Sequence, residues 1–261
     1  MSSEPILCEV QNGVATITLN NPPLNLVTLE LTRQLTETLD RLAADPNARV
    51  LVLTGAGERA FCAGSDISEF PSMMGRGLVV PRKLAPENEA YSKVDDFPKP
   101  TIAAVSGLAF GGGLEMAVCC DLIVVEEDTR LSLPEIKLGV FPGSGGTVRV
   151  TRRIGEGRAK EMMFFGDPID ADTALTWGLV NRVVLKGESL RTAQAMAAIL
   201  AERPNQALRL CKTAVDLSFD TTEDEAVART LALSDEVFAT ADCHEGVRAF
   251  FAKEPPRFSH G

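Results

Sequence analysis

Two glutamates stand in local sequences that could support acid–base chemistry. Glu115 lies two residues after the glycine run 111–113, and Glu135 follows Pro134 within an apolar stretch. A carboxyl group among apolar residues has a raised pKa, because the loss of water disfavours its charged form. Glu135 is therefore a candidate proton donor. Each residue could equally be an ordinary acidic side chain, and Glu115 in particular suits the first turn of a helix.

The glycine run could supply hydrogen-bond donors to an anion. Residues 111–113 precede an apolar, helix-like run at 116–120, and the N–H groups at the start of a helix are free and lie at its positive end. Glu115, three residues beyond Gly112, lies about one helical turn further on and could direct its carboxylate at the same space. The Lys-Ser or Lys-Thr pair of a phosphate-binding P-loop is missing here. We predict an oxyanion site, with close packing as the alternative use of the glycines.

A third segment, residues 60–67, follows a predicted strand at 50–54. Its Gly64-Ser65 step lets the backbone approach a ligand closely and point an N–H group at an oxygen. Gly55, Gly57 and Ala60 also match a dinucleotide-binding pattern in form, but that pattern must open a helix, and Gly64 interrupts it. A plain surface turn is the other alternative.

The elements that would position these segments indicate an α/β fold. Asn-Gly tolerates the positive φ of a tight turn, so residues 6–10 and 14–19 are predicted to form a hairpin. Leucines at helical spacing predict a helix over 28–44. Buried strands are expected at 50–54, 101–105 and 122–125. The prolines and glycines of residues 71–86 are typical of a mobile loop, which would shape a pocket.

The last quarter of the chain has only helical periodicity. Apolar residues recur three or four apart in the segments 188–201, 204–218, 222–240 and 244–252. The pattern divides the chain into a core at residues 1–187 that carries the active site and a helical lobe at residues 188–261.

Composition excludes several classes of function. The 261 residues are 45% hydrophobic, enough for a full core. A net charge of -10 disfavours nucleic-acid binding, which needs a basic surface. The sequence contains no apolar run long enough to cross a membrane, and residues 1–5 lack the features of a secretory leader. We expect a cytoplasmic protein.

Cysteines and histidines do not predict a metal or redox centre. The six cysteines have no paired spacing of the zinc or redox type, so buried, reduced thiols are the better interpretation. The only histidines, His244 and His260, lie near the C-terminus. Metal or catalytic-triad chemistry that depends on histidine is therefore hard to assemble.

Taken together, the motifs resemble those of the crotonase superfamily over nearly the whole chain. The resemblance rests on five stretches in this order: Ala63-Gly64-Ser65-Asp66-Ile67, Gly107 to Glu115, Asp121, Pro134-Glu135-Ile136, and Pro142 to Gly146. It implies a spiral of ββα units followed by a helical oligomerisation lobe. It also implies homotrimers that pair into hexamers, and activity on acyl-CoA thioesters in fatty acid and lipid metabolism.

The resemblance also implies roles for individual residues. The backbone N–H groups of Ser65 and Gly112 would form an oxyanion hole for the thioester carbonyl. Glu115 would hold and activate water, and Glu135 would exchange the proton at C2. This is the chemistry of an enoyl-CoA hydratase, which needs no metal or redox cofactor, since coenzyme A is part of the substrate.

Further substrate contacts are expected on both sides of the oxyanion hole and at the C-terminus. The candidates near the hole are Ala63, Gly64, Ser65, Asp66, Ile67, Ser68 and Gly112. Ser68 departs from the pattern of the family, which often has a basic residue there. Phe250 and Lys253, three residues apart on a predicted helix, could offer an aromatic plane and a positive charge to the adenine end of the coenzyme, or could simply end an amphipathic helix.

Three rival functions share these motifs. An enoyl-CoA double-bond isomerase needs one carboxylate and commonly lacks a glutamate at the place of Glu115. A serine peptidase of the same fold would require a distant histidine partner. A catalytically silent binding protein would not need two carboxylates and two donors. The sequence therefore favours hydration.

Overall fold

The computed structural model describes residues 4–260, so residues 1–3 of the expected leader-free N-terminus lie outside the described part. The strands are β1 (Ile6–Gln11), β2 (Val14–Leu19), β3 (Val50–Gly55), β4 (Ala60–Cys62), β5 (Thr101–Val105), β6 (Leu108–Phe110), β7 (Leu122–Glu126), β8 (Arg130–Ser132), β9 (Ile169–Asp170) and β10 (Arg182–Val184). The α-helices are α1 (Leu29–Ala44), α2 (Ala85–Asp95), α3 (Gly112–Ala117), α4 (Gly146–Ile154), α5 (Glu156–Phe165), α6 (Ala171–Trp177), α7 (Ser189–Ala201), α8 (Asn205–Asp220), α9 (Glu223–Phe238) and α10 (Ala241–Ala252). Two 3-10 helices, η1 (Ile67–Met73) and η3 (Pro134–Leu138), and one π-helix, η2 (Val80–Leu84), complete the elements.

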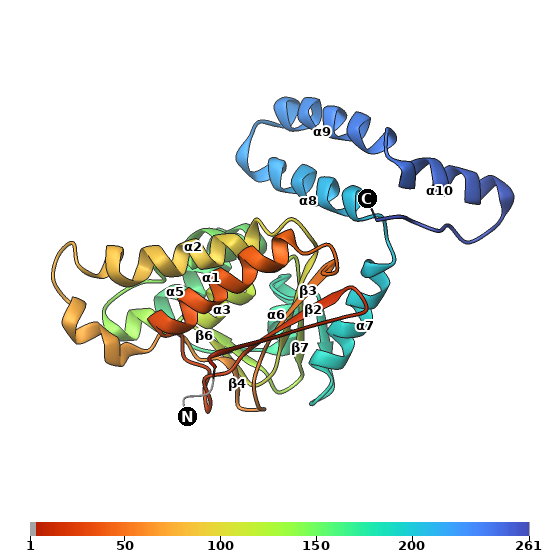
Figure 1. Cartoon of the computed structure of the whole chain (residues 1–261). Coiled ribbons are helices and arrows are strands. Elements are labelled where there is room, and N and C mark those ends of the chain that lie inside the picture. The colour runs from red at the N-terminus through yellow and green to blue at the C-terminus, as the bar shows by residue number, and fades with distance from the viewer. Residues whose placement is uncertain (1–3, 261) are drawn as a thin grey trace.

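Two sheets form the core, and successive units of the chain contribute to both. The larger sheet has the order β1-β2-β3-β5-β7-β10, and the smaller has the order β4-β6-β8-β9. Strands β3, β5 and β7 each belong to the large sheet, and the strand that follows each of them belongs to the small one. The chain thus advances as a spiral of paired strands (Figure 1). The predicted crotonase-like fold is confirmed.

The hairpin and the buried strands lie where the periodicity predicts them. β1 and β2 pair antiparallel through a turn in which Asn12 and Gly13 both have positive φ. β2, β3, β5 and β7 pair in parallel. The central strands β3 and β5 are buried on both faces, as expected for parallel strands covered by helices.

Helix α1 begins where the sequence predicts. The Thr28 side chain accepts a hydrogen bond from the Leu31 N–H and caps the helix. Leu31, Leu35 and Leu39 are buried against the sheet and helix α2. The leucine spacing therefore identifies the covering face correctly.

The segment expected to be a mobile loop, residues 71–86, is largely helical. η1 reaches into it, η2 lies within it, and α2 begins at Ala85. Pro81 and Pro86 occupy the first turns of η2 and α2, where a missing N–H group costs no helical hydrogen bond. The prolines there mark helix starts rather than a loop.

The C-terminal helices divide by their packing. Ala193, Ala197 and Ala201 of α7 pack against the face of the large sheet. Helices α8, α9 and α10 extend away from the sheets as a separate group (Figure 1). The division at residue 188 stays a proposal. Helix α7, which follows it, packs against the core sheet. None of the helices in residues 4–260 is long and apolar enough to span a bilayer.

Candidate active site

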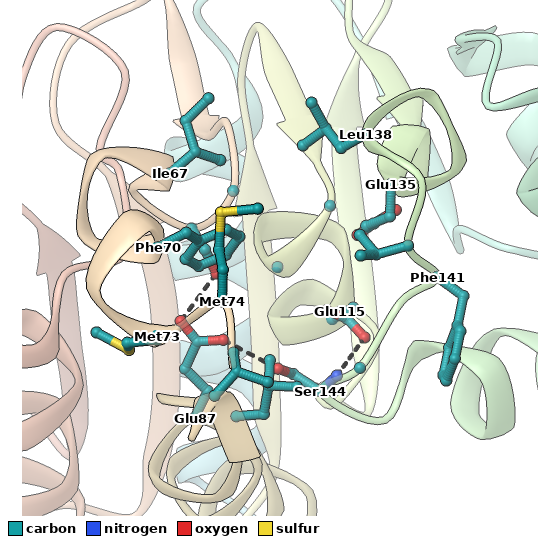
Figure 2. A pocket seen from close by; sticks show the side chains of 18 of the residues that line it. Ile67, Phe70, Met73, Met74, Glu87, Glu115, Glu135, Leu138, Phe141 and Ser144 are labelled. Carbon is teal, nitrogen blue, oxygen red and sulfur yellow. Dashed lines mark hydrogen bonds between the residues drawn. The ribbon is translucent and has the colours of Figure 1, made fainter. Parts of the chain in front are cut away.

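A cavity of about 520 Å³ opens between the ends of β4 and β6 and the segment 67–87. Figure 2 shows Ile67, Phe70 and Met74 along one side and Leu138, Glu135 and Glu115 along the other. The lining residues are Ala63, Gly64, Ser65, Ile67, Phe70, Met73, Met74, Gly75, Arg76, Val79, Leu84, Glu87, Gly111, Gly112, Glu115, Pro134, Glu135, Leu138, Val140, Phe141, Gly143 and Ser144. The cavity therefore joins an apolar wall to a wall that carries carboxyl groups.

The backbone N–H groups of Ser65 and Gly112 lie close together at the N-terminus of α3. An ideal Cβ placed on Gly112 would lie 3.6 Å from the Ser65 nitrogen, and one placed on Gly64 would lie 3.6 Å from the Gly112 nitrogen. Val27 bridges the chain on both sides of Ser65, because the Val27 N–H donates to Gly64 O and the Asp66 N–H donates to Val27 O. These two hydrogen bonds use the backbone groups on either side of Ser65 and do not involve the Ser65 N–H. Gly112 is the first residue of α3, where an N–H group has no acceptor within the helix.

Glu115 lines the same cavity and is held by two backbone hydrogen bonds. Its Oε1 accepts hydrogen bonds from the N–H groups of Ser144 at 2.9 Å and Gly146 at 2.8 Å. Its side chain is only 3% exposed. Burial raises the pKa of Glu115 to about 7, and the negative charge of Glu135 adds to that rise. A carboxyl group with this pKa is available in both protonation states near neutral pH.

Glu135 lies at the start of η3, directly after Pro134. Burial raises the pKa of Glu135 to about 7. Its Oε2 is buried and makes no hydrogen bond within residues 4–260, and an ideal Cβ on Gly111 would lie 3.0 Å from its Oε1. The carboxyl group therefore borders the glycine run. The apolar surroundings expected for Glu135 are present.

Comparisons with known proteins show the family of the chain. The sequence model of the enoyl-CoA hydratase/isomerase family matches residues 9–261. The chain belongs to this family. A protein of Mycobacterium leprae described as "Probable enoyl-CoA hydratase" is 37% identical over 100% of both chains, and one of Rhizobium meliloti with a similar description is 40% identical over 100% of both. The crystal structure of an enoyl-CoA hydratase from Bacillus anthracis is 34% identical, with a TM-score of 0.93 over 98% of this chain and 100% of that one.

Not every predicted contact of this enoyl-CoA hydratase/isomerase family member lies in the cavity. Ala63, Gly64 and Ile67 line it together with Ser65 and Gly112. Asp66 instead caps η1, where its Oδ1 accepts a hydrogen bond from the Ser68 N–H at 2.9 Å. Ser68 is exposed and lies outside the lining.

The C-terminal pair lies on the α8–α10 group, outside the cavity of the same chain. Only Phe250 lies within the expected helix. Helix α10 ends at Ala252, and Lys253 is its C-cap with a left-handed φ of 55°. Phe250 is 78% exposed and stacks edge-on against Phe251, with ring centroids 5.6 Å apart.

A buried polar cluster that was not predicted from the sequence lies behind the expected oxyanion donors. Glu87 of α2 is 1% exposed and accepts hydrogen bonds from the hydroxyl groups of Ser65 and Ser144. Lys83, which is fully buried, lies 3.2 Å from Glu87 and 2.7 Å from Glu69. The i, i+4 spacing of Lys83 and Glu87 was the available signal.

Proposed function

We propose that this chain is an enoyl-CoA hydratase that adds water to a 2-enoyl-CoA and yields a 3-hydroxyacyl-CoA. One observation carries the proposal: the buried Glu115 and the half-buried Glu135, both with raised pKa values, face one cavity beside two backbone N–H donors. Hydration needs a base for water, an acid for C2 and a site for the developing oxyanion. This cavity offers all three.

The Ser65 and Gly112 N–H groups would bind the thioester carbonyl oxygen. Attack at C3 moves electron density onto this oxygen, and each such donor typically stabilises the resulting enolate-like state by about 3 kcal/mol. Because the donors belong to the backbone of a folded core, they would need little reorganisation during the reaction.

The two glutamates would share the proton transfers. Ionised Glu115 would take a proton from water as the water oxygen bonds to C3, and protonated Glu135 would give its proton to C2. One oxygen and two hydrogens are then added to the substrate, and the proton left on Glu115 returns to Glu135 through solvent. With both pKa values about 7, the pair holds one proton most often near neutral pH. The rate should therefore pass through a maximum there.

Double-bond isomerisation is the second candidate, since the family includes isomerases. Isomerisation needs a single carboxylate that moves a proton along the acyl chain. The two N–H groups that fix Glu115 in the cavity favour hydration instead, because they hold a second carboxyl group at the reacting atoms.

The cofactor requirement, the assembly and the location are further parts of the proposal. The reaction requires no cofactor beyond the coenzyme A of the substrate. Homotrimers, or hexamers made of two trimers, in the cytoplasm remain our proposal for its form and place.

Oxygen-labelled water tests the reaction directly. We expect the label in the C3 hydroxyl group of the product when the protein acts on crotonyl-CoA or a longer 2-enoyl-CoA, with mass spectrometry as the measurement. Bond migration with solvent hydrogen exchange alone would establish the isomerase.

A further inference from the structure

Three carboxyl groups border the cavity, and the proposed reaction uses only two. The third, Glu87, is buried in the first turn of α2 and lies against a fully buried lysine. Taking a carboxylate and an ammonium group out of water costs several kcal/mol per ion, so a buried pair is weak evidence for stability alone. Its position therefore calls for a functional reason.

Glu87 connects the two halves of the proposed active site through two serine hydroxyl groups. The Ser65 hydroxyl donates to its Oε1 at 2.8 Å, and the Ser144 hydroxyl donates to its Oε2 at 2.9 Å. The backbone N–H of Ser65 is an expected oxyanion donor. The backbone N–H of Ser144 donates to Glu115 Oε1 at 2.9 Å. A single carboxylate thus contacts the residue that would bind the carbonyl and the residue that holds the base (Figure 2).

The surrounding contacts fix Glu87 and the chain on each side of it. Lys83 Nζ donates to Val27 O at 2.9 Å, the same carbonyl that accepts from the Asp66 N–H beside Ser65. The Asn88 amide donates to Gly143 O at 2.8 Å, next to Ser144.

Helix α2 also backs the second donor. The Tyr91 hydroxyl lies 3.0 Å from an ideal Cβ on Gly112. One face of α2 therefore supports both expected donors and the loop under Glu115.

We propose that Glu87, anchored by Lys83, is a positioning residue that sets the distance between the oxyanion hole and the Glu115 carboxylate. This inference rests on the proposed function for its catalytic consequence. A hydration transition state needs the carbonyl oxygen and the attacking water in register, and small misplacements lower the rate strongly. In this role the serine hydroxyl groups act through their hydrogen bonds to Glu87.

Ser65→Ala and Ser144→Ala test the two connections singly, because both keep the backbone N–H groups in the chain. Loss of one buried hydrogen bond that positions a reacting group should lower kcat by about fivefold, with a smaller change in KM. In the double serine variant, Glu87→Ala should lower kcat no further, since its connections are already broken. Should Glu87→Ala fail to fold, the serine variants alone decide.

Ser189→Ala is the matched control. Its hydroxyl donates to Glu126 Oε1 at 2.8 Å, and both residues are buried and lie outside the cavity. It should lower the melting temperature as the site variants do and leave kcat unchanged. If Ser65→Ala and Ser144→Ala behave like Ser189→Ala, the cluster is only structural and the proposal is wrong.

Two further readouts separate positioning from stability. Burial raises the pKa of Glu115, and the charges of Glu135 and Glu87 raise it further. Glu87→Gln should therefore move the acid limb of the kcat profile to lower pH, whereas an unmoved limb contradicts a role at the reacting groups.

The infrared carbonyl stretch of bound butanoyl-CoA reports on the oxyanion hole without any hydration. Wild type and Ser189→Ala should lower this frequency equally, and Ser65→Ala and Glu87→Ala should lower it less. If the wild-type protein does not hydrate any enoyl thioester but this pattern holds, the proposed function fails and the positioning inference survives. Equal frequencies in all four proteins overturn the inference.

Discussion

The two walls of the cavity are built on different principles. On one wall, two backbone N–H groups and two carboxyl groups come from short motifs at the ends of β4 and β6 and from η3. On the other wall, η1, η2 and α2 contribute two kinds of groups. Phe70 and Leu84 are among the apolar side chains, and the fully buried Lys83 belongs to an ion cluster. In the proposed function, the first wall would carry out the chemistry, and the second would select the acyl group and hold the first in place.

This difference explains which residues are readable in the sequence. Backbone donors require glycine where another segment of the chain passes closely: an ideal Cβ on Gly113 would lie 2.1 Å from Cys62 O. Because glycine is required at defined positions, it forms a recognisable motif in the sequence. An apolar wall can be built from many combinations of methionine, leucine and phenylalanine, so it leaves none.

The largest effect is expected from substitutions of the two glutamates in the cavity. Glu115→Gln and Glu135→Gln should each lower kcat by about 10²- to 10⁴-fold, because each removes a group that transfers a proton in the transition state. KM should change much less. Steady-state kinetics with crotonyl-CoA or the best substrate measure this, and wild-type turnover in either variant removes that residue from the mechanism.

Glu115→Gln should stabilise the protein while it lowers kcat. Between pH 4.5 and about 7, the unfolded chain ionises Glu115 while burial keeps it protonated in the folded protein. The unfolded state then binds fewer protons, so the free energy of unfolding falls as pH rises, by about 3 kcal/mol in total. Glu115→Gln has no such loss, and its amide oxygen can still accept from Ser144 and Gly146.

Urea unfolding at several pH values checks this. The variant should exceed wild type by up to about 3 kcal/mol at alkaline pH, and the two should converge at acid pH, where both side chains are neutral. Parallel curves would mean that Glu115 is not held in a raised-pKa state.

How much the sequence predicts follows the same division. The Asn12-Gly13 hairpin, the leucine face of α1 and the start of α3 at the glycine run each rest on local rules that tertiary packing did not override. Residues 71–86 were misjudged, because proline in a first helical turn has the same composition as proline in a loop. Glu87 was missed for a different reason: its two serine partners are 22 and 57 residues away, and no local pattern encodes such a distance.

A change in the apolar wall should alter selectivity more than chemistry. Phe70→Ala would enlarge the space beside Ile67 and Met74. Each additional buried methylene group contributes about 0.8 kcal/mol, so the ratio of kcat/KM for decenoyl-CoA to that for crotonyl-CoA should rise by about tenfold. Phe238→Ala, on exposed α9, is the control and should leave the ratio unchanged. A constant ratio in both variants would place the acyl chain elsewhere.

The smallest expected effect concerns the lobe outside both walls. The Lys253 side chain is exposed, and charges in water interact weakly, so Lys253→Glu should raise KM for a full CoA thioester only a few-fold. The truncated pantetheine thioester lacks the nucleotide phosphates and should be almost unaffected. Lys186→Glu, an equal charge reversal elsewhere on the surface, controls for the long-range field of a protein whose net charge is -10. Since Lys253 lies outside the cavity of its own chain, a selective loss would also mean that the lobe serves the site of a neighbouring copy. Equal responses to the two thioesters, or to the two lysine variants, would remove Lys253 from coenzyme binding.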